Sequence, residues 1–258
     1  MGSLVKETPY SEITATLEVL ERQGITREHF KKIRADSVFA KRLSGVACGT
    51  WPGSMPVHDD YAFNLWRKFY KEIFDIDEDL YEALKRAIPE SQFDFSWMVI
   101  MHKRITSFTQ IFRAFDYLGV KYADHFLGFE INELDGLFAN ERDPKNGSYL
   151  IRVRNRQEAD VELKDLSADN LKTKCIKSIT VLERLMLELI FFWTTGGHLD
   201  TGSRLTLCSG SRFLPGGYKI PAVRWFNQGH DDPNQHLSYG TCSFVSTGWS
   251  SRQVLSWR

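Results

Sequence analysis

The sequence of 258 residues has few cysteines and no net charge. The first feature argues against a zinc site and the second against nucleic-acid binding. Its cysteines, Cys48, Cys175, Cys208 and Cys242, lie far apart and form no CxxC or CxxH spacing, so they do not indicate a zinc site. We expect free buried thiols, although Cys208 and Cys242 could meet across adjacent strands. Lys and Arg number 33, as do Asp and Glu, so no overall field attracts nucleic acid, and we expect no nucleic-acid partner.

Long hydrophobic runs are also missing. The longest, "LMLELIFFW", is too short and too interrupted by charge to cross a bilayer, and the start "MGSLVKETPYSEIT" has no apolar core of signal-peptide length. We therefore expect no membrane insertion and a protein that is cytoplasmic as synthesised, which leaves display on a cell or virion surface open. Hydrophobic residues still make up 42% of the chain, enough for a substantial core.

Helical periodicity dominates the first 140 residues. In "SEITATLEVLERQG", Ile13, Leu17 and Leu20 recur at helical spacing and Gly24 ends the run. Thr26 can cap a second helix, "REHFKKIRADSVFAKRL", and the aromatic stripe of "DDYAFNLWRKFYKEIF" is typical of a helix that packs on a core. A further helix is expected at "DEDLYEALKRAI". These patterns predict a mainly helical N-terminal domain over residues 1–140.

The period changes after residue 141, where we place a domain boundary. Alternation in "SYLIRV" predicts a strand at Tyr149–Val153, and "SADNLKTKC" predicts a short helix. Thr180 and Glu183 form a capping box for the apolar helix "VLERLMLELIFFWTT", which Gly196 ends. Short strands follow at "RLTLCSGSRF", "YKIPAVRWF", "HLSYGTCSF" and "SRQVLSW", and the last is expected to pair with Tyr149–Val153. The predicted fold class is α+β.

This order of elements resembles the C-type lectin fold, in which an early strand pairs with the final one. More specifically, "ERDPKNGSYLIRVRNRQEADVELKDLSADNL", "ITVLERLMLELIFFWTTGGHLD", "LTLCSGSR" and "SSRQVLSW" resemble variable proteins of diversity-generating retroelements. The resemblance implies a C-type-lectin-like ligand-binding domain over residues 141–258, with a variable segment at about 223–244. It also implies that a reverse transcriptase diversifies this segment by copying a template with errors at adenines.

The segment "VRWFNQGHDDPNQHLSYGTCSF" has a composition that suits this interpretation. From Phe226 to Phe244 it contains no Lys, Arg or Glu, and most of its polar residues can be reached from Asn codons by changes at adenines; Gln228 and Gln235 cannot. Aromatic side chains would supply rigid contact area, with adaptable polar groups around them. Ordinary loops also favour Asn, Asp and Gly. The predicted contact residues for a protein or glycan ligand are Arg224, Trp225, Phe226, Asn227, His230, Asp231, Asp232, Asn234, His236 and Tyr239.

If the segment is a surface, its residues should alternate between exposed and buried where it forms a strand. Arg224 and Phe226 should then lie outside, while Val223 and Trp225, or their neighbours by one register, point inward.

Two other kinds of site remain open. His230, Asp231, Asp232 and His236 could converge on zinc or manganese, although no HxH or HExxH spacing fixes their geometry, so we expect no metal and no other cofactor. The alternative function is therefore a metal-binding protein or an enzyme of the formylglycine-generating-oxidase-like branch of the same fold. Such an enzyme would need paired cysteines, and Cys208 and Cys242 are the only pair that could meet. We expect no catalytic residue. His198 and Asp200 follow a helix end and are interpreted as turn residues.

Overall fold

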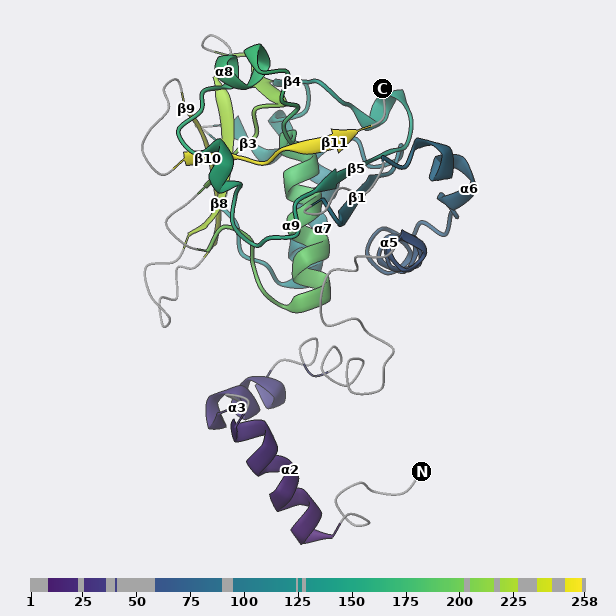
Figure 1. The fold of residues 1–258 in the computed structure, drawn as a ribbon, viewed down its shortest axis with the longest axis vertical. Helices are drawn as coiled ribbons and strands as arrows, with labels where there is room; N and C mark the ends of the chain where they lie inside the picture. The colour runs from purple at the N-terminus through teal and green to yellow at the C-terminus, as the bar shows by residue number, and fades with distance from the viewer. Residues whose placement is uncertain are drawn as a thin grey trace. The chain divides into compact units, whose positions relative to one another are not determined.

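The computed structural model describes residues 9–22, 26–35, 40, 59–89, 95–123, 125–126, 129–201, 205–215, 219–226, 236–242 and 249–256. The chain forms two compact units, Met1–Gly53 and Ser54–Arg258. The first contains α2 (Tyr10–Arg22), at the position that the sequence predicts, and α3 (Arg27–Ala35), which covers the first part of the helix predicted at 27–43 (Figure 1). The second contains all the other helices and strands that are described below.

The division of the chain differs from the predicted boundary near residue 141. Strand β1 (Trp97–Met101) pairs antiparallel with β5 (Tyr149–Val153), so residues on both sides of that boundary share one sheet. All five residues of β1 are buried. A run that is apolar on both faces has no alternation, and this is why its sequence did not indicate a strand. The chain is α+β, but residues 1–140 are not only helical.

Helices and short strands surround β1 in the second unit. Helix α5 (Asp59–Phe74) buries the aromatic stripe predicted for it, whereas "DEDLYEALKRAI" forms only α6 (Tyr81–Leu84) and the 3-10 turn η1 (Lys85–Ala87). Helix α7 (Phe108–Leu118) follows β1, with a capping box at Ser107 and Gln110 and a left-handed Gly119 at its end. Two-residue strands β2 (His125–Phe126) and β3 (Phe129–Glu130), the turn η2 (Ile131–Glu133) and strand β4 (Phe138–Asn140) lead to the turn η3 (Pro144–Asn146).

A three-stranded sheet in the second unit has the order β1, β5, β11 (Val254–Ser256). Val254 lies opposite Val153 and Ser256 opposite Ile151, in antiparallel register. The predicted pairing of the last strand with Tyr149–Val153 is therefore confirmed. Val153, Ile151 and Val254 of these two strands are at most 2% exposed.

Helix α9 (Val181–Thr195) runs through the middle of this unit (Figure 1). Its ends confirm the sequence prediction: Thr180 and Glu183 form the capping box, and Gly196 takes the left-handed conformation at φ 73°. Leu185 and Leu189 are 1% and 0% exposed. Ahead of α9 lie the turn η4 (Val161–Leu163) and the short helix α8 (Ala168–Thr173), which Ser167 caps as predicted.

A second sheet carries the segment of interest. Its order is β10 (Trp249–Ser251), β6 (Leu205–Leu207), β8 (Ile220–Phe226) and β9 (His236–Cys242), with β10 parallel to β6 and the other pairs antiparallel. Strand β7 (Ser211–Phe213) pairs with β4 instead. Among the described residues, no helix combines the length and the apolar character that a bilayer crossing requires.

Candidate ligand-binding surface

Most of the described residues of segment 223–244 lie in the antiparallel strands β8 and β9. All seven residues of β8 have partners in β9, from Ile220 opposite Cys242 to Phe226 opposite His236. Directly opposed residues of an antiparallel pair project from the same face. Residues 227–235, which join the two strands, lie outside the described part of the chain.

One face of this strand pair presents a cation and two rings. The guanidinium of Arg224 lies over the ring of Phe226, 5.0 Å from its centroid. The rings of Phe226 and His236 are 5.3 Å apart. All three side chains are half-buried, so they are accessible yet held in place by one another. We call Arg224, Phe226 and His236 the surface triad.

The opposite face of the pair is buried, in the alternation that the sequence predicts. Val223 is 1% exposed, Trp225 6% and Leu237 0%. Trp225 was among the predicted contact residues, and the structure corrects this, because its side chain packs inward. Its ring stacks on the imidazole of His198, with centroids 3.4 Å apart and planes 3° from parallel.

His198 links the strand pair to helix α9. Its other face stacks on Phe192 at 4.8 Å between ring centroids, so the imidazole lies between two aromatic rings. Its Nδ1 is 2.9 Å from Oε1 of Glu188, which is fully buried on α9. His198 follows the end of α9, as predicted, and its ring also packs against Trp225.

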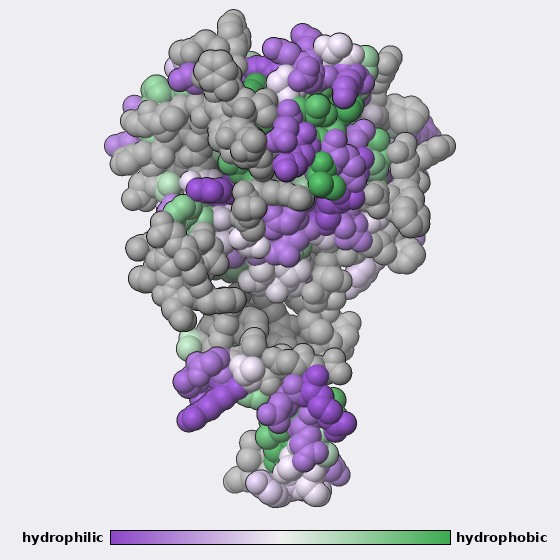
Figure 2. All heavy atoms as spheres, turned by 60° about the vertical axis from the view of Figure 1, so that its left-hand side comes forward, coloured by the Kyte–Doolittle hydropathy of each residue, from purple (hydrophilic) through white to green (hydrophobic). Residues whose placement is uncertain are grey.

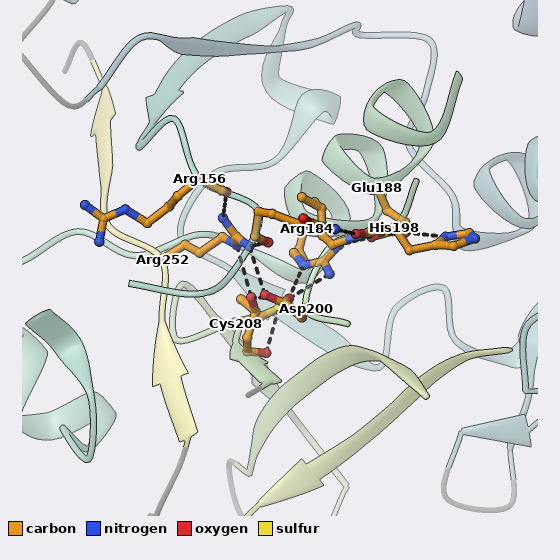
Figure 3. Close-up of polar contacts among 10 residues, drawn as sticks. Arg156, Arg184, Glu188, His198, Asp200, Cys208 and Arg252 are labelled. Atoms are coloured by element: carbon orange, nitrogen blue, oxygen red, sulfur yellow. Dashed lines mark hydrogen bonds and ion pairs between the residues drawn. The ribbon is translucent and has the colours of Figure 1, made fainter. Parts of the chain in front are cut away.

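Behind Glu188 lies a group of buried charges (Figure 3). Nη1 of Arg184 donates to Glu188 Oε2 at 2.8 Å, and its Nε and Nη2 donate to Oδ2 of Asp200 at 3.1 and 2.7 Å. Oδ1 of Asp200 accepts from Nη2 of Arg252 at 2.8 Å. Side chains of Arg184, Glu188 and Asp200 are 0% exposed and that of Arg252 1%. These four residues are the buried ion network.

Every guanidinium nitrogen of both arginines has a hydrogen-bond partner. Nε of Arg252 donates to Thr206 Oγ1 at 3.1 Å, and its two Nη atoms donate to the carbonyls of Arg156 and Gln157 at 3.0 and 2.5 Å. Thr206 in turn donates to Asp200 at 2.6 Å. Arg252 precedes β11 and Thr206 is part of β6, so the network ties both sheets to α9.

The electrostatics favour the ionised forms of Asp200 and Arg184. Burial on its own raises the pKa of Asp200, but the guanidinium groups of Arg252 and Arg184 lower it more, so its pKa lies below the usual range. Burial opposes the charge of Arg184, yet Asp200 and Glu188 raise its pKa above the usual value. Asp200 also has a left-handed backbone, with φ 54°, a conformation that Asp adopts more readily than most residues. It is in a turn as predicted, but its role is that of a buried counter-ion.

Sequence reasoning missed this network. The available signal was the pair Arg184 and Glu188, spaced i and i+4 in a helix whose middle is otherwise apolar. Charges on a helix predicted to be almost wholly buried must find partners inside the protein. Asp200, which pairs with Arg184, and Arg252, which pairs with Asp200, come from distant positions that no spacing rule connects.

The remaining predicted contact residues have different outcomes. Tyr239 lies in β9 opposite Val223, and only its backbone is described. Asn227, His230, Asp231, Asp232 and Asn234 lie outside the described residues. Arg224, Phe226 and His236 come together as the surface triad.

Cys208 does not have the properties of a reactive thiol. Its side chain is 0% exposed, and burial raises its pKa well above the usual range, which disfavours the thiolate. Cys208 is a free buried thiol, as predicted, whereas Cys175 is free but exposed. Within the described ranges no group of three or more His, Cys, Asp or Glu side chains could hold a metal ion.

Comparison with known proteins adds no relative. The chain matches no protein-family model, no curated protein and no solved structure.

Proposed function

We propose that this chain is a hypervariable ligand-binding protein with a C-type-lectin-like second unit, diversified by a retroelement. Its ligand is a protein or a glycan, bound by the surface triad and the segment 227–235. The observation that carries the proposal is the division of the β8–β9 pair into two faces. One face is fixed by Val223, Trp225 and Leu237, and the other leaves Arg224, Phe226 and His236 accessible.

The composition of the segment supports the same function. The triad combines one cation with two rings, and residues 227–235 add Asn, Asp, Gln and His but no Lys, Arg or Glu. Aromatic groups and Arg are enriched at the centres of protein interfaces, while adaptable polar groups surround them. A phosphate backbone would require a denser cluster of cations.

Support for the lectin-like interpretation comes from the chain order. Strand β5 is followed by α8 and α9, then by the short strands of the second sheet, and β11 returns to pair with β5. The buried ion network holds that return in place, because Arg252 lies between β10 and β11, two residues before Val254, and donates to Asp200. Variation in 227–235 would then leave the scaffold unchanged.

The DNA beside the gene tests diversification. We expect a reverse-transcriptase gene and an imperfect repeat of the DNA that encodes residues 223–257, with the differences concentrated at adenines of the repeat. A neighbouring region without both features would contradict the retroelement part of the proposal and leave the binding surface to be tested separately.

The metal-binding alternative uses His230, Asp231, Asp232 and His236 and has a separate test. Under our proposal, elemental analysis of the purified chain finds no stoichiometric zinc or manganese, and dialysis against a chelator leaves the melting temperature unchanged. A stoichiometric metal, or a fall of many degrees on chelation, would favour the alternative.

A further inference from the structure

The N-terminal unit has helices that bury none of their own apolar residues. Helix α2 contains no buried residue, and Leu17 and Val19 are 44% and 52% exposed. On α3, Phe30 and Ile33 are only half-buried. Figure 2 shows hydrophobic residues, in green, at the surface of this unit beside hydrophilic ones in purple. In the described part of Met1–Gly53 the apolar stripe therefore lacks a cover.

The two helices frame a groove that such a cover would fill. It is lined from α2 by Leu17 and Glu21, and from the start of α3 onward by Thr26, Arg27, Phe30, Ile33 and Arg34. Its volume is about 590 Å³. The helices have 13 and 9 residues, and isolated helices shorter than about 12–15 residues are marginal in water. A partner that packs on the apolar stripe would supply the missing stabilisation.

The charges of the two helices indicate which partner fits. Helix α2 carries the acids Glu12, Glu18 and Glu21 against one base, Arg22. Helix α3 carries the bases Arg27, Lys31, Lys32 and Arg34 against one acid, Glu28. The helices thus have opposite net charge. In a two-fold symmetric dimer, α2 of each molecule can lie beside α3 of the other. The acidic helix then meets the basic helix at two equivalent places.

We propose that the helix pair α2–α3 is a self-association surface, and that its occupant is the helix pair of a second copy of this chain. Leu17, Phe30 and Ile33 of both copies meet in the groove. Glu21 of each copy faces Arg27 and Arg34 of the other. This inference does not depend on the proposed function, because unit Met1–Gly53 contains none of the residues used there. The resulting dimer carries two copies of the second unit.

The oligomeric state of the full chain is the first test. We expect light scattering after size exclusion to give the dimer mass at micromolar concentration. The double variant Leu17→Asp, Phe30→Asp should give the monomer mass, whereas Val19→Asp, which is exposed but does not line the groove, should stay dimeric. A wild-type chain that is monomeric at all concentrations overturns the proposal, and so does a double variant that remains a dimer.

Charge exchange distinguishes a second copy from any other occupant. Glu21→Arg alone, and Arg27→Glu with Arg34→Glu, should each weaken the dimer by at least roughly tenfold, because like charges face each other. Mixing these two variants should restore a heterodimer, since each acid again meets a base. If the mixture does not associate, the groove binds the other unit of the same chain or a foreign partner, and the proposed pairing is wrong. Restored association in the mixture also shows that the helices of both charge variants are still folded.

Discussion

Arginine has opposite environments in the buried ion network and in the surface triad. In the network, every nitrogen of the Arg184 guanidinium has a carboxylate partner, and the side chains are 0–1% exposed. In the triad, Arg224 contacts the face of Phe226 and both are half-buried. Saturated charges in the interior fix the geometry of the scaffold, whereas half-buried groups contribute little stability and can vary. Trp225 and His198 connect the two regions.

The largest expected effect is the loss of a buried charge. Asp200→Ala leaves Arg184 and Arg252 without their shared counter-ion, and breaking a buried pair costs about 3–5 kcal/mol. The matched control is Glu162→Ala, which removes a surface pair with Arg156 at 2.8 Å and should cost less than about 1 kcal/mol. Urea unfolding of both variants measures the difference. Equal losses would show that the network does not stabilise the scaffold.

A smaller loss of stability is expected where the loop after β6 packs against the residues just before α9. A Cβ on Gly210 would lie 2.5 Å from the carbonyl oxygen of Ser178, which is backbone and cannot rotate away. Gly210→Ala should therefore cost about 1–3 kcal/mol through overpacking. At Gly197 a Cβ would make ordinary contacts at 3.4 and 3.6 Å, so Gly197→Ala should be nearly neutral. A thermal melt of each variant tests this contrast, and similar melting temperatures would refute it.

The smallest effect is a pH dependence within the scaffold. His102 is buried, its Nδ1 accepts from the N–H of Arg104 at 3.1 Å and its Nε2 faces Glu78 at 3.1 Å. Burial lowers its pKa below the usual value, although Glu78 partly opposes this. The unfolded chain thus binds a proton at higher pH than the folded chain. This stability is present above about pH 6.5 and is lost as pH falls toward the folded pKa.

Comparing urea unfolding at pH 7.5 and 5.5 measures this dependence. The wild type should lose up to roughly 1 kcal/mol more than His102→Gln over this range. The other histidines are common to both proteins, so the difference reports His102 alone. If both proteins lose the same free energy, His102 does not carry the effect.

The sequence predicted those parts of the fold that have local signals. The capping box of Thr180 and Glu183, the left-handed Gly196 and the pairing of β5 with β11 were all foreseen and are confirmed. The alternation around Val223 and Trp225 also predicted which face of β8 is buried. The helix ends and the alternation depend on residues close in sequence or on a simple period. The β5–β11 pairing was inferred from two alternating strands at the ends of the predicted second domain.

Other parts depend on long-range contacts. Strand β1 was missed because an apolar run buried on both faces has no period, and the domain boundary was misplaced as a result. Helix α7 could have been found from Ser107 and Gln110, a capping box in the sequence. The buried ion network could not, since Arg184, Asp200 and Arg252 are far apart in sequence and only the tertiary fold brings them together.

The central claim is that the scaffold and the binding surface are separate. It is tested most directly by displaying two libraries of this protein and comparing their protease resistance after heating. The first randomises the predicted contact positions Asn227, His230, Asp231, Asp232, Asn234 and His236. The second randomises the buried positions Asp200, Thr206, Val223, Trp225, Leu237 and Arg252. We predict that most members of the first library stay resistant, because surface changes usually cost within about 0.5 kcal/mol, while most of the second are cleaved. Equal loss of resistance in the two libraries would contradict the account.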